Sequence, residues 1–159
     1  MNAESLINIS EAFLKSHQQK SKNVYLLDAI TPDVLAIHAK NSGPIGSGER
    51  PLLAVNKKIP GTIGGYGWSG LLITDKNLYY KCVKDNFFSS LIVLTNKGIL
   101  PLEQIKSLAI GRHDACLGTA YIGHQLVING KVVGLLRMGG GMLLDEKAIN
   151  ELQYIFSNI

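Results

Sequence analysis

The stretch that decides the fold is Gly67–Lys81, which reads GWSGLLITDKNLYYK. The stretch covers most of two apolar runs, Tyr66–Thr74 and Leu78–Val83, and the polar turn residues Asp75–Asn77 between them. Because Asn tolerates the positive φ that tight turns require, the pattern predicts two antiparallel strands joined by a short turn. This pair predicts a class of fold and carries no chemistry of its own.

Short apolar runs with turn residues between them continue on both sides of this pair. The predicted strands are Leu52–Lys58, Tyr66–Thr74, Leu78–Val83, Leu91–Thr95, Gly98–Leu102, Ile105–Ile110, Gln125–Ile128 and Lys131–Leu136. The last two flank Asn129–Gly130, which is the strongest hairpin signal in the chain because both residues accept the positive φ of a type I′ turn.

Helices are predicted only outside the strand region. Apolar residues recur at helical spacing over about Ala3–His17. Thr31–Asp33 places an N-cap before a proline at the first helical position, so a second helix begins there and ends before Asn41. Asp145 caps a third helix, whose apolar face should close over an apolar opening.

This order of elements predicts an α+β fold. We expect an antiparallel bent sheet or roll of about seven strands with a C-terminal helix, preceded by two N-terminal helices. A parallel doubly wound sheet is disfavoured, because no helix alternates with the strands from Arg50 to Met138. Residues 1–49 are predicted to form a helical extension, and residues 50–159 the β-roll domain.

Composition excludes several classes of protein. The 159 residues are 46% hydrophobic and 18% charged, which is typical of one globular domain with an appendage. The net charge of +4 is not gathered into a basic run, so nucleic acid is not an expected partner. With no signal peptide pattern and no apolar stretch long enough for a membrane span, we expect a cytoplasmic protein with reduced thiols at Cys82 and Cys116.

Motifs that suggest catalysis are weak on spacing or context. Gly65–Gly70 matches G-x-G-x-x-G but opens a strand, whereas a nucleotide site needs it to open a helix, so these glycines are interpreted as conformational. The cluster His113, Asp114 and Cys116 supports one alternative, a small hydrolase or transferase that uses a Cys/His pair. No metal site is predicted, because these residues and His124 lack metal-ligand spacing apart from Asp114 and Cys116. No cofactor and no small-molecule substrate are predicted either.

The residues also suggest a family. Gly70–Lys81, then ILPLEQIK at Ile99–Lys106, then a hairpin and a terminal amphipathic helix, resemble the bacterial pleckstrin-homology-like domains over about residues 52–159. The resemblance implies a bent seven-stranded sheet, capped at one end by the C-terminal helix, that serves as a binding scaffold. Many eukaryotic pleckstrin-homology domains bind phosphoinositides with basic residues of the first hairpin. Here only Lys57 and Lys58 lie near that place, which leaves weak binding to an anionic membrane surface as a second alternative.

The expected function is therefore a non-enzymatic binding or assembly module that contacts a protein partner or itself. The candidate partner surface is Tyr66, Trp68, Tyr80, Lys57 and Lys58. Strand alternation must send either Tyr79 or Tyr80 to the outer face, where an aromatic ring offers a large contact area. Such a module should also carry a sizeable apolar patch on the sheet edge or on the terminal helix.

Overall fold

The computed structural model describes residues 1–16, 21–60, 66–84, 95–114, 122–137 and 144–159. Within these ranges, the side chains of residues 58–60, 66–67, 113–114, 122 and 137 are not described. The predicted strand over Leu91–Thr95 falls outside the described residues except for Thr95.

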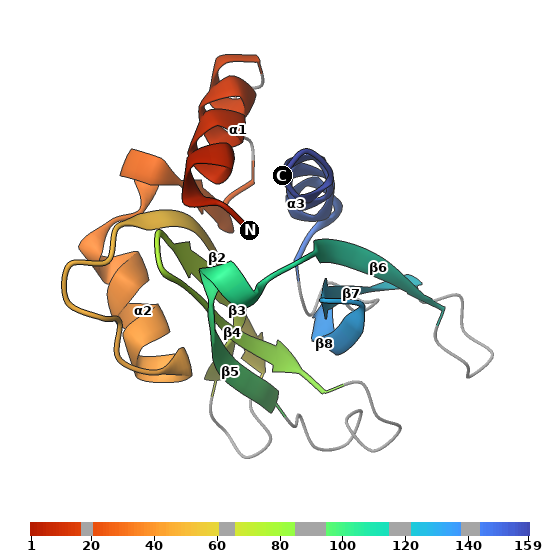
Figure 1. The fold of residues 1–159 in the computed structure, drawn as a ribbon. Helices are drawn as coiled ribbons and strands as arrows, with labels where there is room; N and C mark the ends of the chain where they lie inside the picture. The colour runs from red at the N-terminus through yellow and green to blue at the C-terminus, as the bar shows by residue number, and fades with distance from the viewer. Residues whose placement is uncertain (17–20, 61–65, 85–94, 115–121, 138–143) are drawn as a thin grey trace.

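Three α-helices, two short 3-10 turns and eight strands make up the described fold (Figure 1). In chain order they are α1 (Ala3–Ser16), β1 (Val24–Leu26), η1 (Leu27–Ala29), α2 (Pro32–Ser42), β2 (Pro51–Pro60), β3 (Tyr66–Thr74), β4 (Asn77–Val83), β5 (Thr95–Pro101), η3 (Leu102–Gln104), β6 (Leu108–Asp114), β7 (Ile122–Ile128), β8 (Lys131–Arg137) and α3 (Glu146–Ser157). Of the described helices, none is long and apolar enough to cross a bilayer.

All strand pairs are antiparallel, in the order β1-β2-β3-β4-β8-β7-β6, with β5 also paired to β4. The sheet divides where β4 meets β8, at the single register pair Val83↔Leu135. Strands β6–β8 turn away from β2–β5 at this point, so the sheet is bent (Figure 1). The predicted α+β class with a bent antiparallel sheet is therefore confirmed.

The decisive stretch forms the predicted strand pair, β3 and β4, with Ile73 opposite Leu78. The Thr74 hydroxyl closes the turn by accepting hydrogen bonds from the backbone N–H of Lys76 (3.2 Å) and of Asn77 (2.9 Å). Thr74 also donates to the Glu49 carboxylate (2.5 Å), which accepts further bonds from Asn77 and from the Tyr79 hydroxyl, both at 2.9 Å. The turn thus holds the loop that leads into β2.

Hydrogen bonding also sets the charge state of Glu49. Burial alone would raise the pKa of its carboxyl, but the bonds from Thr74, Tyr79 and Asn77 outweigh burial and lower the pKa below its ordinary value of 4.5. Glu49 is therefore ionised at neutral pH and stabilises this corner of the fold.

Gly70, the last glycine of the G-x-G-x-x-G match, has a packing role. It lies opposite Asn56 on β2, and a Cβ atom at this position would collide with the Val55 carbonyl oxygen. The described part of the motif, residues 66–70, lies in β3, so the interpretation of these residues as structural agrees with this close approach of two backbones.

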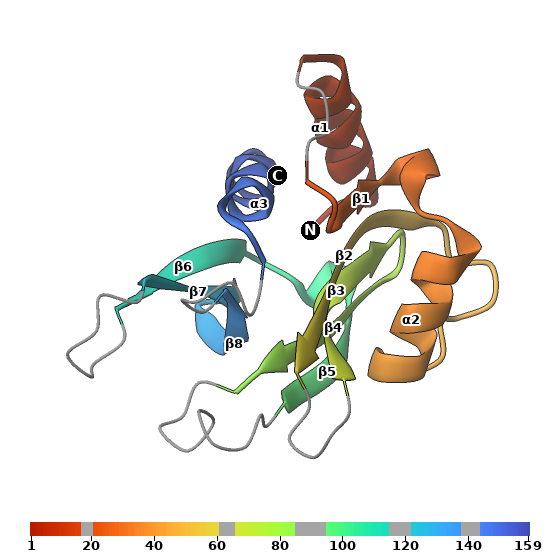
Figure 2. The same cartoon turned by 180° about the vertical axis from the view of Figure 1, so that it is seen from behind.

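The two hydrophobic clusters lie on opposite faces of the sheet. The larger one joins the inner face to α1 and α3, and includes Leu6, Leu71 and Leu152. The smaller one lies between the outer face and α2, and includes Val34, Leu72 and Tyr79. Figures 1 and 2 show α2 against β2–β5, with α1 and α3 side by side on the other side.

Residues 1–49 also contribute a strand, which the sequence does not predict. Val24–Leu26 forms β1, which pairs with Leu53–Val55 of β2 at the edge of the sheet (Figure 2). A run of three residues is too short to show alternation, and its partner lies about thirty positions away, so only the tertiary pairing reveals this strand.

The predicted local signals at the C-terminal end are present. Asn129 and Gly130 have φ values of 52° and 75° at the turn between β7 and β8, as a hairpin of this type requires. Asp145 is the N-cap of α3, where its side chain accepts a hydrogen bond from the Ala148 backbone N–H (2.8 Å). The strand predicted over Ile105–Ile110 instead begins at Leu108, because η3 occupies the preceding turn.

Candidate functional site

The predicted partner surface lies at one end of the β2–β4 region. Lys57 pairs with Ser69, and Lys58 pairs with Trp68, on neighbouring strands. Trp68 and Lys57 are each partly exposed, so both are accessible to a partner. Tyr66 lies at the start of β3, but its side chain and that of Lys58 are outside the description.

The expectation that Tyr79 or Tyr80 presents its ring on an outer face needs correction. The two side chains do point to opposite faces, but both faces are covered. Tyr79 is buried beneath α2, at 2% exposure, and Tyr80 is half-buried against the larger core cluster. The Tyr80 ring also packs over Gly98 of β5, where a Cβ atom would lie only 2.6 Å from the tyrosine oxygen. Tyr80 is therefore mainly a packing residue.

Residues of the catalytic alternative are only partly described. His113 and Asp114 are the last two residues of β6, their side chains are not described, and Cys116 lies outside the described residues. Cys82 is buried in the core, and burial raises the pKa of its thiol to about 12, which makes it a poor nucleophile. No group of three or more His, Cys, Asp or Glu side chains gathers as a metal site within the described ranges.

An open groove lies between β6 and the C-terminal half of α3. Its volume is about 420 Å³, and it is lined by Leu108, Ala109, Ile110, Gln153, Phe156 and Ser157. Leu108 and Phe156 are 7% exposed and form an apolar floor, whereas Gln153 and Ser157 supply polar groups. The groove therefore offers both apolar area and polar groups.

The backbone of β6 adds directional hydrogen-bonding groups to this groove. Among the described strands, β6 pairs with β7 alone and lies at one end of the sheet. Asn129 N–H donates to the Ser107 carbonyl (2.9 Å), which fixes the phase of the antiparallel ladder. Alternation from that bond turns the N–H and C=O of Leu108 and Ile110 away from β7, toward the open edge.

The side chain of Asn129 holds the approach to this edge. Its amide oxygen accepts from the backbone N–H of Lys106 (2.6 Å) and of Ser107 (3.2 Å), and its amide nitrogen donates to the Gln104 carbonyl (2.9 Å). The β7–β8 turn therefore positions the chain that enters β6.

Comparisons with known proteins add no identification. No family model matches the chain, and searches of curated proteins and of solved structures find no match.

The groove was only partly foreseeable. The predicted apolar face of the last helix is buried at Ile149, Leu152, Ile155 and Phe156. Helical periodicity identifies that face, but it does not reveal that the helix leaves a groove beside β6. That result depends on where residues 108–110 lie relative to residues 153–157.

Proposed function

We propose that this chain is a non-enzymatic binding or assembly module with a pleckstrin-homology-like fold, and that it binds an extended protein segment along β6. The order of elements supports the fold proposal. Seven strands, β2 to β8, run in one antiparallel sheet and are followed by α3, which packs beside β6. The segment with α1, β1 and α2 then precedes the domain.

The single observation that carries the binding proposal is the open edge of β6 beside the groove. An extended segment that pairs with β6 would satisfy the N–H and C=O of Leu108 and Ile110, as in other cases of strand addition. Its alternate side chains would reach the apolar floor formed by Leu108 and Phe156. The segment can come from another protein or from a second copy of this chain, and both use the same groups.

A proline substitution on the open edge tests this proposal. Ile110→Pro removes an N–H that faces away from β7, so the β6–β7 ladder keeps its bonds while strand addition loses a donor. Ile110→Ala is the matched control, because it keeps the N–H and removes a similar amount of side chain. Both variants are compared by thermal unfolding to show that they remain folded.

The probe is a displayed library of random ten-residue peptides, with sedimentation velocity as the measurement of self-association. We expect peptide capture or self-association by the wild-type chain, retention in Ile110→Ala and at least a tenfold loss in Ile110→Pro. Absence of both kinds of binding, or equal binding by the proline variant, would contradict the proposal.

A further inference from the structure

A second feature lies on the other side of the sheet, where α2 covers the outer face, and it is separate from the β6 groove. The residues that α2 buries are Val34, His38 and Ser42, which follow one another at intervals of four and so form one stripe along the helix. Of these three, Val34 alone is apolar, and it joins the smaller hydrophobic cluster with Leu72 and Tyr79. The rest of the stripe is polar, and His38 lies at its middle.

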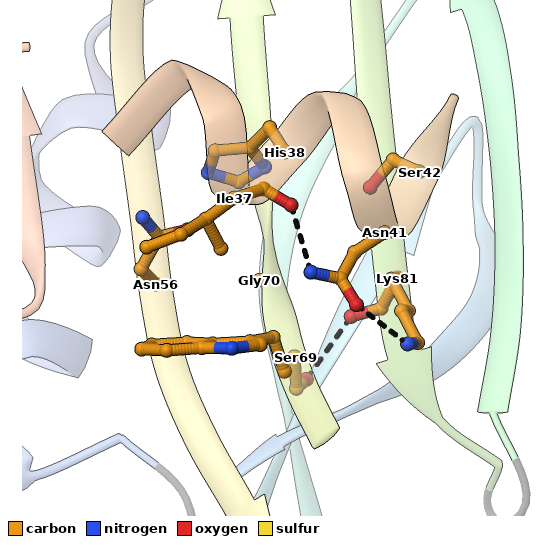
Figure 3. A pocket seen from close by; sticks show the side chains of 9 residues that line it. Ile37, His38, Asn41, Ser42, Asn56, Ser69, Gly70 and Lys81 are labelled. Atoms are coloured by element: carbon orange, nitrogen blue, oxygen red, sulfur yellow. Dashed lines mark hydrogen bonds between the residues drawn. The ribbon is translucent and has the colours of Figure 1, made fainter. Parts of the chain in front are cut away.

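His38 lines a small polar pocket between α2 and the sheet. The pocket has about 10 Å³ of free space, and its lining comes from α2 and three strands (Figure 3). The lining residues are Ile37, His38, Asn41, Ser42, Asn56, Trp68, Ser69, Gly70 and Lys81. His38 is 3% exposed, and its Nε2 atom has no hydrogen-bond partner in the part of the chain that the structure describes. A pocket of this size cannot admit the hydration shell of a cation, so only the neutral imidazole suits it.

The charges around His38 offer an imidazolium no compensation. On α2, the charged residues Asp33 and Lys40 are both exposed to solvent. On the sheet, Lys81 of β4 belongs to the lining and carries a positive charge, and Lys97 of β5 lies opposite Lys81 in the register. The lining residues from β2 and β3 are uncharged. A second positive charge on His38 would therefore be both buried and unpaired.

This environment couples the protonation of His38 to the docking of α2. Burial lowers the pKa of His38 from its ordinary value of 6.5 to about 4, and an imidazole that returns to water regains the ordinary pKa. Docking is therefore at full strength above about pH 6.5 and weakens as the pH falls toward 4, because the released helix binds the proton more tightly. The ratio of released to docked helix should be about twentyfold larger at pH 5 than at pH 7.

Both ends of the segment that carries α2 are held by contacts in which His38 takes no part. Before the helix, β1 pairs with β2. After the helix, the Glu49 carboxylate accepts hydrogen bonds from Thr74, Asn77 and Tyr79. The pKa of Glu49 lies below 4.5, so the carboxylate remains ionised at pH 5. The helix thus lies between two fixed points that mild acid leaves intact.

We propose that α2 is a cover that mild acid releases, because protonation of His38 detaches the helix from the sheet while β1 and the Glu49 corner stay in place. Release uncovers the apolar outer face at Leu72 and Tyr79, which are 0% and 2% exposed beneath the docked helix. This device does not depend on strand addition at β6.

Amide hydrogen exchange of the full chain at pH 7 and pH 5, resolved by segment with mass spectrometry, tests the proposal. Each rate is divided into the intrinsic rate of the same amide at that pH, which gives a protection factor. We expect the protection factors of α2 to fall about twentyfold from pH 7 to pH 5, while those of α3 change little. Unchanged protection of α2 would overturn the proposal. An equal loss in α3 would overturn it too, because the whole domain would then be unfolding.

Histidine variants locate the effect. His38→Gln and His38→Leu do not titrate in this range, so the protection of α2 should be similar at both pH values, and a thermal melt at pH 7 shows whether each variant is folded. His124→Gln is the matched control, because it removes a histidine of β7 and leaves His38 in place, so α2 should respond as in the wild type. A folded His38 variant that keeps the twentyfold fall, or a His124→Gln variant that loses it, would also overturn the proposal. If neither His38 variant folds, the comparison of α2 with α3 in the wild type still decides.

Discussion

Replacing Asn129 by alanine should destabilise the entry to β6 through two separable effects. The substitution removes three hydrogen bonds to Gln104, Lys106 and Ser107. They are exposed to solvent, so each contributes about 0.5 kcal/mol, at the low end of the usual range. It also places an alanine at φ 52°, which costs about 1 kcal/mol. The expected loss in free energy of unfolding is therefore about 2–3 kcal/mol.

Asn129→Gly separates the two effects, because glycine accepts the positive φ and also loses the three hydrogen bonds. Urea unfolding, followed by circular dichroism, should show a loss of about 1–2 kcal/mol for the glycine variant, smaller than the loss for alanine. A loss of less than about 0.5 kcal/mol in free energy of unfolding for Asn129→Ala, which is the contribution of one exposed hydrogen bond, would refute the reasoning. Equal losses in the two variants would refute the backbone contribution.

Three further predictions concern other parts of the fold. Gly70→Ala should lower the free energy of unfolding by about 1–3 kcal/mol, because the new Cβ atom collides with the Val55 carbonyl oxygen. Gly48 has φ 73° but lies in open space, so Gly48→Ala should lower it only by the backbone cost of about 1 kcal/mol in the same unfolding assay. Glu49→Gln should lower stability at pH 7 by about 1–3 kcal/mol. The folded pKa of Glu49 lies below the unfolded pKa, so the stabilisation by its carboxylate is complete above the unfolded pKa and disappears as the pH falls through the folded pKa. The free energies of unfolding of the variant and the wild type should therefore converge in acid. A constant difference between them down to pH 2 would contradict this. Cys82 should resist labelling by iodoacetamide at pH 8 until the protein is unfolded, because its thiol is buried and its pKa is raised. Mass spectrometry of the labelled chain measures this, and labelling of Cys82 at the rate of a free thiol would be inconsistent with its burial.

Thiol labelling also bears on the catalytic alternative. With Cys82 protected, rapid labelling of the native chain at pH 6–7 would identify Cys116 as an activated thiol, which the hydrolase or transferase hypothesis requires.

Local signals in the sequence predict much of the fold. The turn after Thr74, the Asn129–Gly130 hairpin and the Asp145 cap each depend on residues within a few positions of one another, and all three are present. Their physical causes are the backbone conformations and side-chain bonds available to single residues. Such causes can be recognised without a tertiary structure.

Features that depend on distant pairing could not be predicted in the same way. β1 exists because Val24–Leu26 pairs with Leu53–Val55. β6 begins only at Leu108 because η3 occupies the preceding turn, and the distant Asn129 side chain holds the residues between η3 and β6. The outer face of the sheet also looked exposed from alternation alone. It is covered because α2 packs on Leu72 and Tyr79.

Both candidate sites have this long-range character. The groove combines residues 108–110 with residues 153–157, and the small polar pocket beneath α2 combines that helix with three strands. Trp68 is a candidate contact residue from the sequence alone. The burial of His38, which is 3% exposed, depends on the packing of α2 against the sheet and could not be read from the sequence.

The central claim is that β6 binds an extended protein segment through its open edge. Residue-resolved amide hydrogen exchange of the wild-type chain, with and without a peptide selected from the library, tests it most directly. The account predicts that the amides of Leu108 and Ile110 exchange more slowly when the peptide is bound, while Ala109, already paired with β7, changes little. Unchanged exchange at Leu108 and Ile110, with protection elsewhere on the sheet, would contradict it.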